Sequence, residues 1–373
     1  MNRALNLAHR GQGLVEPNPM VGCVLVRKGR IIGEGFHRRF GGPHAEVEAL
    51  RSCEVNPRGA IAYVTLEPCC HQGKTPPCTD ALIRAGVARV VVGVRDPNPL
   101  VGGRGLQALR RAGVQVDVGI CQSEARALIA PFTTWMTQRR PYVIAKWAQG
   151  IDGSLVTPPD VSRWISCEAS RRFAHQIRAR VDAIVVGVGT VLADNPTLTA
   201  RGVRVRRVAT RIVLDPRLRT PLNARVTRDT SSFPTLVVAT PSAACGPKAD
   251  RFRRKGVEVI GCRSRDDGLD LSDCLSTLAA RGMTNVLVEG GPTILTAFFS
   301  ERLVDEAFVF VAPRWIGGHD ARRTPRSAAN VRPSADFFGR VRAPMAAVEV
   351  ITRRVGSDVL YHLLLSKLLR DGR

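Results

Sequence analysis

Short apolar runs alternate with amphipathic segments along the chain, and this pattern predicts its secondary structure. In the first part, runs short enough to be buried strands span residues 20–26, 30–35, 60–66, 88–94 and 114–118. Segments with the apolar spacing of a helix span residues 2–12, 46–50, 78–85 and 106–112. The first two strands flank Lys28 and Gly29, which predicts a hairpin. Such an alternation of strands and helices is typical of a three-layer α/β domain.

The alternation begins again after a helix predicted over residues 128–140, which ends in the basic pair Arg139 and Arg140. The strands expected beyond this point span residues 141–147, 182–188, 211–214, 235–239, 257–260, 285–288 and 305–311, with a final strand pair within 348–366. Helices are expected over residues 168–179, 271–280 and 294–303. A chain of 373 residues has room for about two domains of 100–200 residues each. We therefore predict one domain over residues 1–140 and a second over residues 141–366.

The chain is strongly basic, with 55 Lys and Arg residues against 32 Asp and Glu residues and a formal net charge of +23. A protein of this kind either binds nucleic acid or takes phosphorylated ligands. The basic residues are spread from Arg3 to Arg373, and the aromatic residues that would stack on bases make up only 5%. We therefore favour a small phosphorylated ligand and expect no specific nucleic-acid partner.

Neither a membrane segment nor a secretion signal is expected. No run of about 18 uncharged apolar residues occurs, and the N-terminal residues lack the apolar core of a signal peptide. The ten cysteines show no disulfide-like framework. We expect a cytoplasmic protein with reduced thiols and no membrane partner.

The residues best suited to chemistry lie between His44 and Cys78. His44 is followed two residues later by Glu46, and Cys69 follows a predicted buried strand. One imidazole and two thiolates suit Zn²⁺ and leave a fourth position for water. A glutamate that reaches this water without binding the metal can carry its proton to a leaving amine, as in zinc deaminases. This stretch therefore predicts a zinc-dependent deaminase in which Glu46 carries the proton.

The second cysteine ligand does not follow from the usual deaminase spacing, because Gln72 occupies the position three residues after Cys69. Either Cys70 or Cys78 must take its place. Adjacent cysteines point apart, whereas Cys78 begins a predicted helix, whose N-terminus favours a thiolate. We therefore choose Cys78, together with His44 and Cys69, as the zinc ligands.

A purely structural zinc site is the alternative. In such a site, Cys70 or His71 would fill the fourth position and leave no place for water. Glu46 beside His44 argues against this, because a structural site does not need a proton carrier.

Three stretches, residues 17–23, 44–46 and 67–78, closely resemble the bifunctional deaminase–reductase family of riboflavin biosynthesis. The loop over residues 71–77 separates that family from nucleoside and tRNA deaminases. The resemblance implies a cytidine-deaminase-like fold for the N-terminal domain. It also implies that polar residues in turns contact the deaminase substrate, namely Asn18, His37, Lys74, Asp96 and Asn98.

Glycine-rich turns join strands to helices at two places in the second half, residues 187–190 and 289–293. Such turns favour the phosphates of a bound nucleotide at a helix N-terminus, although neither matches the dinucleotide fingerprint. Together with residues 146–148, 162–165 and 194–196, they resemble the reductase half of the same family. The resemblance implies a dihydrofolate-reductase-like fold that uses NADPH.

The resemblance also implies two groups of contacts in this half. The residues implied to bind NADPH are Ala148, Trp164, Thr190, Asp194, Gly291, Pro292, Thr293, Ile294, Leu295, Thr296 and Ala297. Those implied to bind the reductase substrate are Lys146, Ser162, Arg178, Leu198, Arg201 and Glu289. Guanidinium groups bind phosphate through paired hydrogen bonds, so Arg178 and Arg201 suit a sugar phosphate. Our hypothesis is that Lys146 and Glu289 assist proton transfer and orient the opened sugar.

Two positions depart from the resembled family. Gly150 and Pro216 stand where serine is usual, so each can remove a hydroxyl contact to cofactor or substrate. One neutral hydrogen bond contributes about 0.5–1.5 kcal/mol. We therefore expect a slower reductase rather than an inactive one.

We expect a homo-oligomeric enzyme of riboflavin biosynthesis with zinc and NADPH as cofactors. Its first domain would deaminate the phosphorylated pyrimidine 2,5-diamino-6-(5-phosphoribosylamino)pyrimidin-4-one, and its second would reduce the ribosyl side chain to ribityl. The alternative enzyme is a tRNA or other nucleic-acid deaminase with a basic binding domain, which the charge favours and the reductase-like half disfavours. A third interpretation is a zinc-stabilised RNA-binding protein without activity, which the presence of Glu46 disfavours.

Overall fold

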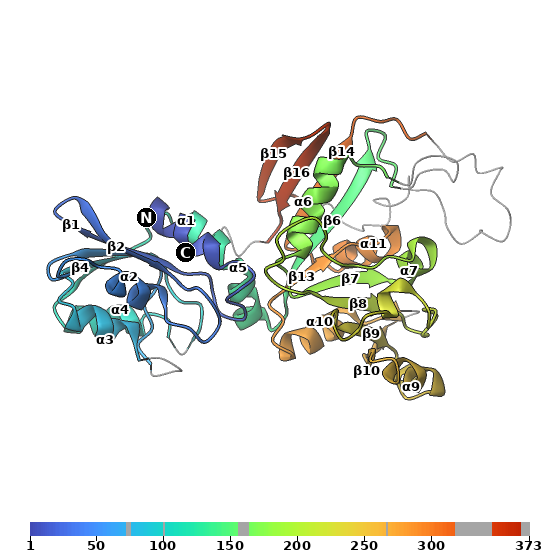
Figure 1. Cartoon of the computed structure of the whole chain (residues 1–373), viewed down its shortest axis with the longest axis horizontal. Helices are drawn as coiled ribbons and strands as arrows, with labels where there is room; N and C mark the ends of the chain where they lie inside the picture. Colours follow the sequence, from blue (N-terminus) through green and yellow to red (C-terminus); the bar gives the residue numbers. More distant parts are fainter. Residues whose placement is uncertain (72–75, 100, 156–163, 266–267, 318–344, 367–373) are drawn as a thin grey trace. The chain divides into compact units, whose positions relative to one another are not determined.

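The computed structural model describes residues 1–71, 76–99, 101–155, 164–265, 268–317 and 345–366 (Figure 1). Contacts divide the chain into two compact units, one spanning Met1–Arg140 and the other containing Pro141–Arg281 and Asn285–Lys367. Two residues expected to bind substrate, Lys74 and Ser162, lie outside the described residues. None of the helices described combines the length and apolar character that crossing a membrane requires.

The first unit is built on a five-stranded mixed sheet. Its strands are β1 (Gly22–Arg27), β2 (Arg30–Phe36), β3 (Ile61–Leu66), β4 (Arg89–Val94) and β5 (Gln115–Val118), in the order β2-β1-β3-β4-β5. β1 runs antiparallel to β2 and β3, whereas β3, β4 and β5 are parallel. Lys28 and Gly29 turn the hairpin with φ angles of 49° and 75°, the left-handed conformation that matches the twist of paired strands.

Helices cover both faces of this sheet (Figure 1). One face carries α1 (Asn2–Ala8), with the 3-10 turn η1 (His9–Gly11) after it, and α5 (Gln122–Gln138). The other face carries α2 (Ala45–Arg51), α3 (Cys78–Arg84) and α4 (Arg104–Arg111). Leu82 of α3 and Leu109 of α4 are fully buried, and each such side chain stabilises the fold by about 1.5–3 kcal/mol. The unit is the three-layer α/β domain expected from the sequence.

The second unit is built on a nine-stranded sheet with the order β10-β9-β8-β7-β13-β6-β14-β16-β15. Its strands are β6 (Tyr142–Gly150), β7 (Ala183–Gly187), β8 (Thr210–Leu214), β9 (Thr235–Ala239), β10 (Glu258–Gly261), β13 (Asn285–Val288), β14 (Glu306–Ala312), β15 (Glu349–Val355) and β16 (Asp358–Leu364). Neighbouring strands from β10 to β14 are parallel, and the hairpin β15–β16 is antiparallel. Because β6, β13 and β7 are parallel neighbours, residues at their carboxyl ends meet at one edge of the sheet.

The connections between these strands contain the remaining elements. They are α6 (Glu168–Arg178), α7 (Val188–Asp194), η2 (Arg225–Thr227), α8 (Pro241–Ala244), α9 (Pro247–Arg253), the strand pair β11 (Ser264–Arg265) and β12 (Gly268–Leu269), α10 (Leu271–Ala280) and α11 (Pro292–Ser300). Two of these helices, α7 and α11, begin directly at or beside the carboxyl ends of β7 and β13, so their N-termini face the same edge of the sheet.

The helix α5 begins earlier than the sequence pattern predicts, at Gln122 rather than at residue 128. Ala125 is buried in the same core cluster as Leu128, whereas the residues between them are partly or fully exposed. The additional residues of the helix therefore bury only one small side chain. The apolar spacing that predicts a helix from sequence is too weak over these residues to be recognised.

The helix α7 was predicted as a glycine-rich turn, and α11 begins at Pro292 rather than at residue 294. Val188 and Val191 of α7 are buried, so packing outweighs the low helix propensity of Gly189. Proline is favoured in the first turn of a helix, where its missing N–H is not needed. Both differences bring a helix N-terminus closer to the ends of β7 and β13.

Gly150 closes β6 at a position that has no room for a side chain. A Cβ atom there would lie 2.5 Å from Asp152 Oδ1 and 2.9 Å from the carbonyl oxygen of Arg314. Asp152 is held in place because its Oδ2 accepts the backbone N–H groups of Ile316 and Gly317 at 3.1 and 2.9 Å. Glycine at this position therefore satisfies the local packing of this chain.

We predict that Gly150→Ser lowers the free energy of unfolding of the second unit by about 1–3 kcal/mol, the usual effect of overpacking, and does not accelerate reduction. Gly246→Ser is the matched control, because a Cβ at Gly246 would find its nearest atom at 3.5 Å and serine is favoured at the start of a helix. Thermal denaturation measures both variants. A Gly150→Ser protein as stable as the control would contradict the packing argument.

Candidate functional site

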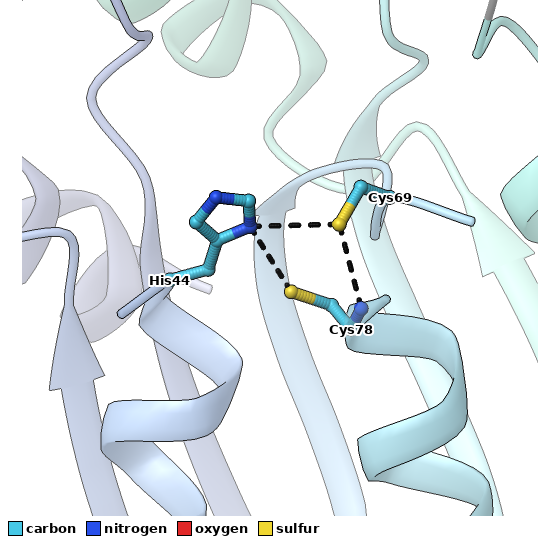
Figure 2. A group of neighbouring side chains, drawn as sticks. All are labelled: His44, Cys69 and Cys78. Carbon is cyan, nitrogen blue, oxygen red and sulfur yellow. Dashed lines mark hydrogen bonds between the residues drawn. The ribbon is translucent and has the colours of Figure 1, made fainter. Parts of the chain in front are cut away.

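Three metal-binding side chains converge in the first unit (Figure 2). His44 directly precedes α2, Cys69 lies after β3, and Cys78 is the first residue of α3. His44 Nδ1 is 3.2 Å from Cys78 Sγ and 3.5 Å from Cys69 Sγ, and the three ligand atoms lie within 4.8 Å of one another. The backbone N–H of Cys78 also donates to Cys69 Sγ at 3.4 Å. Two helix starts and a strand end thus bring the predicted ligands together.

The protonation of the two thiols suits a metal. The hydrogen bond with Cys78, opposed by burial, lowers the pKa of Cys69 to about 4, while the same hydrogen bond and burial raise the pKa of Cys78. A cation bound between the two sulfurs would hold both as thiolates, the form that binds metals. One imidazole nitrogen and two sulfurs are the ligands that zinc prefers, so this set fits zinc.

The alternative ligands Cys70 and His71 are not part of this cluster in the part of the chain that the structure describes. Cys70 is half-buried, and burial raises the pKa of its thiol, which disfavours the metal-binding form. His71 is exposed and lines the cavity beside the cluster. This arrangement favours the ligand set chosen from the sequence.

Glu46 lies in the first turn of α2 and is only 3% exposed. Burial, followed by the charge of Cys69, raises the pKa of its carboxyl group to about 7. A carboxyl group with a pKa near neutrality can both accept and release a proton, as a general acid–base catalyst must. Glu46 therefore has the property that the sequence interpretation requires.

A cavity of about 370 Å³ opens beside His44, Glu46 and Cys69. Four residues expected to contact the deaminase substrate also line it, namely Asn18, His37, Asp96 and Asn98. Burial raises the pKa of Asp96 to about 6, and its Oδ1 accepts the backbone N–H of Asn98 at 2.8 Å. The structure therefore brings these predicted residues together with the metal-binding cluster.

His37 fixes the orientation of Asn18. The Nδ1 atom of His37 lies 2.9 Å from the carbonyl oxygen of Pro43, which can only accept, so Nδ1 carries the proton. His37 Nε2 then accepts from Asn18 Nδ2 at 3.1 Å. Burial lowers the pKa of His37, which keeps the ring neutral. Because the amide nitrogen of Asn18 is the donor, its amide oxygen is the atom left to accept a hydrogen bond from a ligand. The orientation of the amide group follows from these donor and acceptor roles.

The apolar wall of this cavity was not predicted from the sequence. Phe132, Trp135 and Met136 of α5 line it, together with Phe40. Flat aromatic side chains suit a planar ring, since stacking is favourable for both. The spacing of the three α5 residues marks one face of a helix, so a signal existed, but without the fold nothing said what that face would meet.

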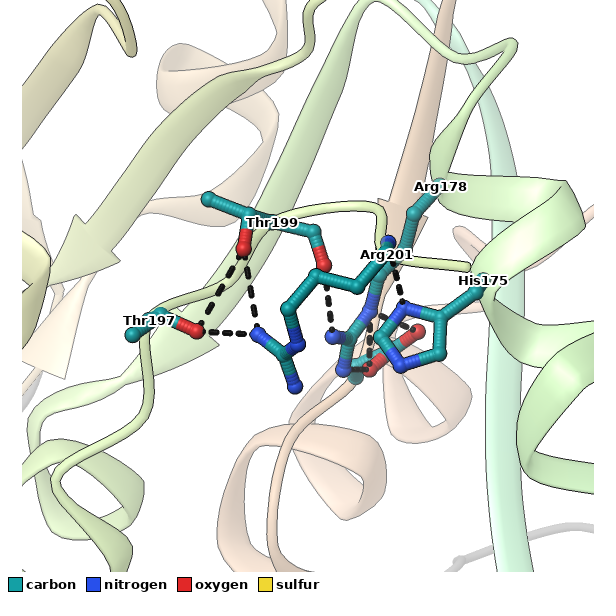
Figure 3. Close-up of polar contacts among 6 residues, drawn as sticks. His175, Arg178, Thr197, Thr199 and Arg201 are labelled. Atoms are coloured by element: carbon teal, nitrogen blue, oxygen red, sulfur yellow. Dashed lines mark hydrogen bonds and ion pairs between the residues drawn. The ribbon is translucent and has the colours of Figure 1, made fainter. Parts of the chain in front are cut away.

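A second cluster of charged side chains lies in the second unit (Figure 3). Glu289 directly follows β13, and Arg178 ends α6. Arg178 Nε donates to the two carboxylate oxygens of Glu289 at 3.0 and 3.1 Å, and Arg178 Nη2 also contacts Glu289. Burial alone would raise the pKa of Glu289, but the charges of Arg178 and Lys146 outweigh it and hold the pKa at about 2. Burial in turn lowers the pKa of Lys146.

The loop after α7 brings a second arginine to this cluster (Figure 3). The backbone N–H of Arg201 donates to His175 Nδ1 at 3.3 Å, and Arg201 Nη1 donates to Thr199 Oγ1 at 3.1 Å and also contacts Thr197. Leu198, which lies between the two threonines, is buried with a left-handed φ of 53°. This conformation is uncommon for a branched residue, so the surrounding contacts must hold it.

His175, Thr197 and Thr199 were not predicted from the sequence. Burial, together with the charges of Arg178 and Arg201, lowers the pKa of His175 to about 4, so the ring stays neutral beside two guanidinium groups. Histidine and threonine at these positions carry no motif of their own. Their contribution depends on contacts that only the folded loop creates.

The turns after β7 and β13 fit a phosphate-bearing cofactor. The backbone N–H of Gly291 donates to Thr190 Oγ1 at 3.2 Å, and α11 begins at the next residue. A Cβ built at Gly189 would meet nothing within 4 Å, and one at Gly291 would meet only Thr190 Oγ1, at 3.8 Å. The backbone is thus open to close approach beside a helix N-terminus, which favours an anion. These features fit the dinucleotide expected from the sequence.

The other residues expected to contact the cofactor lie on several elements. Pro292–Ala297 form the first turns of α11, Ala148 lies in β6, and Asp194 ends α7. Trp164 is 47% exposed, and the guanidinium group of Arg171 lies 5.0 Å from the centre of its ring. An aromatic ring of this kind suits stacking against a flat ligand.

The fold and the two sites define a zinc-dependent deaminase joined to a nucleotide-dependent reductase. Known proteins match both parts. The family model of the cytidine and deoxycytidylate deaminase zinc-binding region matches residues 1–94, and that of the RibD C-terminal domain matches residues 141–342.

Relatives match nearly the whole chain. The riboflavin biosynthesis protein RibD of Aquifex aeolicus is 46% identical over 317 residues, which cover 85% of this chain and 87% of the relative. RibD of Escherichia coli is 39% identical over 368 residues, which cover 98% of each. A solved structure of Acinetobacter baumannii RibD aligns with a TM-score of 0.80, at 34% identity, over 98% of this chain and 97% of that one.

The Thermotoga maritima diaminohydroxyphosphoribosylaminopyrimidine deaminase/5-amino-6-(5-phosphoribosylamino)uracil reductase aligns over the same shares with a TM-score of 0.81 and 34% identity. The chain therefore belongs to the RibD family of riboflavin biosynthesis. It is a bifunctional enzyme, a zinc-dependent deaminase followed by an NADPH-dependent reductase. The fold class, the two activities and the two cofactors expected from the sequence are confirmed.

We predict that Cys78→Ala removes or greatly weakens zinc binding, because it deletes one of three converging ligands. Cys70→Ala is the matched control, since it removes a neighbouring thiol outside the cluster and should leave stoichiometric zinc. Elemental analysis of the purified variants measures the metal content. A zinc-free Cys70→Ala protein would show that the ligand set is wrong.

Proposed function

We propose that this chain catalyses in sequence the two reactions for which the Thermotoga maritima protein is named. The first is deamination of a phosphoribosylated diaminopyrimidinone, and the second is reduction of the ribosyl side chain of the resulting uracil derivative to ribityl. The proposal rests on a single cavity. It is lined by Glu46 and by two members of the metal-binding cluster, His44 and Cys69. Asn18, Asp96 and Asn98 line the same cavity. Ammonia release and NADPH oxidation with the diaminopyrimidine phosphate test the proposal directly.

In the proposed deamination, Glu46 moves protons and the cavity holds the ring. His44, Cys69 and Cys78 would hold zinc, which would supply the acidity that makes a water molecule a nucleophile at neutral pH. Glu46 accepts the proton of this water and returns it to the departing amine, so that oxygen replaces nitrogen on the ring carbon and ammonia leaves.

Binding of the pyrimidine ring is assigned to the other residues of the cavity. Asn18, whose amide is oriented by His37, together with Asp96 and Asn98, offers hydrogen bonds to its polar edge. The apolar wall from α5 offers its face a stacking surface. Lys74 is proposed to bind the phosphate of the same substrate.

In the proposed reduction, the charged cluster orients the opened sugar. NADPH, when bound, supplies a hydride. Arg201 is assigned to the sugar phosphate, and Arg178, fixed by Glu289, adds positive charge beside it. Lys146 has a lowered pKa, so it suits the proton transfer that completes the reduction. Ser162 and Leu198 are proposed as further contacts to this substrate.

The alternative of a nucleic-acid deaminase is not supported. The matches to RibD proteins run through both parts of the chain, including the reductase. The net charge of +23 was its main support, and a phosphorylated substrate together with a phosphorylated cofactor needs basic residues as well. A small-molecule substrate therefore accounts for the site.

Location and assembly are further proposals. All ten cysteines are free thiols, and thiolate ligands require a reducing compartment, which supports a cytoplasmic location. A homo-oligomer is supported by β15, an edge strand of the described sheet, where Val350 and Ile351 are 53% and 43% exposed. Exposed apolar side chains on an edge strand favour pairing with another chain.

We predict that Val350→Lys lowers the molar mass measured in solution by light scattering. Ile31→Lys is the control, because Ile31 is similarly exposed, at 54%, and belongs to the first unit. A wild-type protein that is monomeric at all accessible concentrations would contradict the assembly proposal.

We predict that Glu46→Gln retains zinc and slows ammonia release by about 10²- to 10⁴-fold, the usual effect of losing a general acid–base catalyst. The same variant should oxidise NADPH normally when the deaminated substrate is supplied. The physical reason is that the residues assigned to each activity lie on separate sides of the proposed boundary between Arg140 and Pro141. Loss of reduction in a folded Glu46→Gln protein would show that the two activities are coupled.

The reverse experiment completes this prediction. Lys146→Ala and Asp194→Ala should impair reduction while sparing ammonia release, because both residues belong to the second unit. Measuring both activities in every variant separates a local effect from general unfolding.

A further inference from the structure

Glu67 is a third buried glutamate, and it lies between the end of β3 and the end of β4 in the first unit. The mechanism proposed above does not use it. Glu67 directly follows β3 and is 3% exposed. Its backbone N–H donates to the carbonyl oxygen of Val94, the last residue of β4, at 3.0 Å. This bond fixes the backbone of Glu67 between the turn after β3, which carries Cys69, and the loop after β4.

Among the described residues, the carboxylate of Glu67 accepts hydrogen bonds from four backbone N–H groups. Its Oε2 accepts from Asp96 at 3.2 Å and from Gly103 at 3.0 Å. Its Oε1 accepts from Gly105 at 3.0 Å and from Leu106 at 3.3 Å. One buried side chain thus holds both ends of the loop that joins β4 to α4.

The first turn of α4 also packs directly against the turn that carries Cys69. A Cβ atom at Gly105 would lie 2.1 Å from the carbonyl oxygen of Pro68, the residue between Glu67 and Cys69. Only glycine allows this approach, because a side chain would push the backbones apart. Within the loop, Asp96 Oδ1 accepts the backbone N–H of Asn98, so the two substrate-facing residues move as one.

We propose that Glu67 is a positioning residue for deamination, which sets the distance between the substrate-binding loop and the metal-binding turn. The inference rests on the proposed function, because it takes Asp96 and Asn98 as substrate contacts. Cys69 lies two residues after Glu67, so one side chain ties the loop to the turn that carries a metal ligand.

A role limited to capping α4 does not explain this geometry. A helix cap needs only the bonds to Gly105 and Leu106, which are the second and third residues of α4. The bonds from Oε2 reach Gly103, the N-cap residue, and also Asp96, which lies seven residues earlier and lines the cavity. Loss of Glu67 is therefore expected to weaken substrate binding as well as the helix.

The test is the substitution Glu67→Gln, which keeps the size of the side chain but replaces one acceptor oxygen by an NH₂ group. At least one pair of backbone donors then faces a donor, and a buried donor left unpaired weakens the arrangement markedly. We expect the KM of the deaminase substrate to rise about tenfold or more, with kcat changed much less and zinc still stoichiometric.

Glu34→Gln is the matched control, because Glu34 is a carboxylate of the same unit that pairs with Arg3 at 2.6 Å outside the cavity. This variant should leave KM unchanged.

Gly105→Ala is the second test. Its Cβ would disturb the approach of α4 to Pro68 and to the Glu67 carboxylate, while Glu67 itself stays intact. It should raise KM in the same way. A folded, zinc-loaded Glu67→Gln protein with wild-type KM would overturn the proposal.

Hydrogen exchange of the wild-type protein decides the matter if both variants fail to fold. The amide protons of Asp96, Gly103, Gly105 and Leu106 should exchange slowly, and rapid exchange at Asp96 and Gly103 would overturn the proposal. This measurement needs no substrate. A wild-type protein that shows slow exchange but releases no ammonia from the diaminopyrimidine phosphate would contradict the proposed function and not the contact.

Discussion

A carboxylate that is removed from water must find positive charge or hydrogen-bond donors, and both sites depend on how this constraint is met. Burial, followed by the charge of Cys69, raises the pKa of Glu46 to about 7. Glu289 is also buried, yet Arg178 and Lys146 hold its pKa at about 2. The same residue type therefore becomes a proton carrier in one unit and a permanent anion in the other. Glu67 shows a third solution, in which four backbone N–H groups donate to the carboxylate.

The permanent anion has a consequence for the reductase site. Arg178 donates to both oxygens of Glu289 and also to the carbonyl oxygen of Thr199, so its guanidinium group is fixed before any ligand binds. A fixed cation costs little further ordering when a phosphate arrives, and this raises affinity. Burial and the charges of Arg178 and Arg201 lower the pKa of His175 to about 4, so the ring stays neutral and does not add a third cation to the cluster. The cluster thus suits the sugar phosphate proposed to bind there, and only the neutral form of histidine is compatible with the neighbouring charges.

The sequence was sufficient for the chemistry and for most of the strands, but not for the walls of the sites. His44, Glu46 and Cys69 were found because few residue types bind zinc or carry protons, and their spacing is characteristic. The strands were found because buried parallel strands are continuous apolar runs. The wall from α5 was missed because an aromatic side chain on a helix usually belongs to the core. Contacts such as Arg201 with His175 were missed because they join segments that only the folded loop brings together.

The high positive charge, which first suggested nucleic acid, is partly used inside the fold. Arg211 of β8 is only 2% exposed, and it donates to Thr235 Oγ1 at 2.9 Å and to the carbonyl oxygens of Arg228 and Phe233 at 2.7 and 2.8 Å. Burial lowers its pKa to about 10, so it remains charged at neutral pH while it holds three segments together. Arg178 is likewise committed to Glu289. A charge summed from the sequence counts such buried cations as if they faced solvent, and so it overstates the surface potential available to a polyanion. Part of the charge that would argue for nucleic acid is instead a structural feature of the reductase unit.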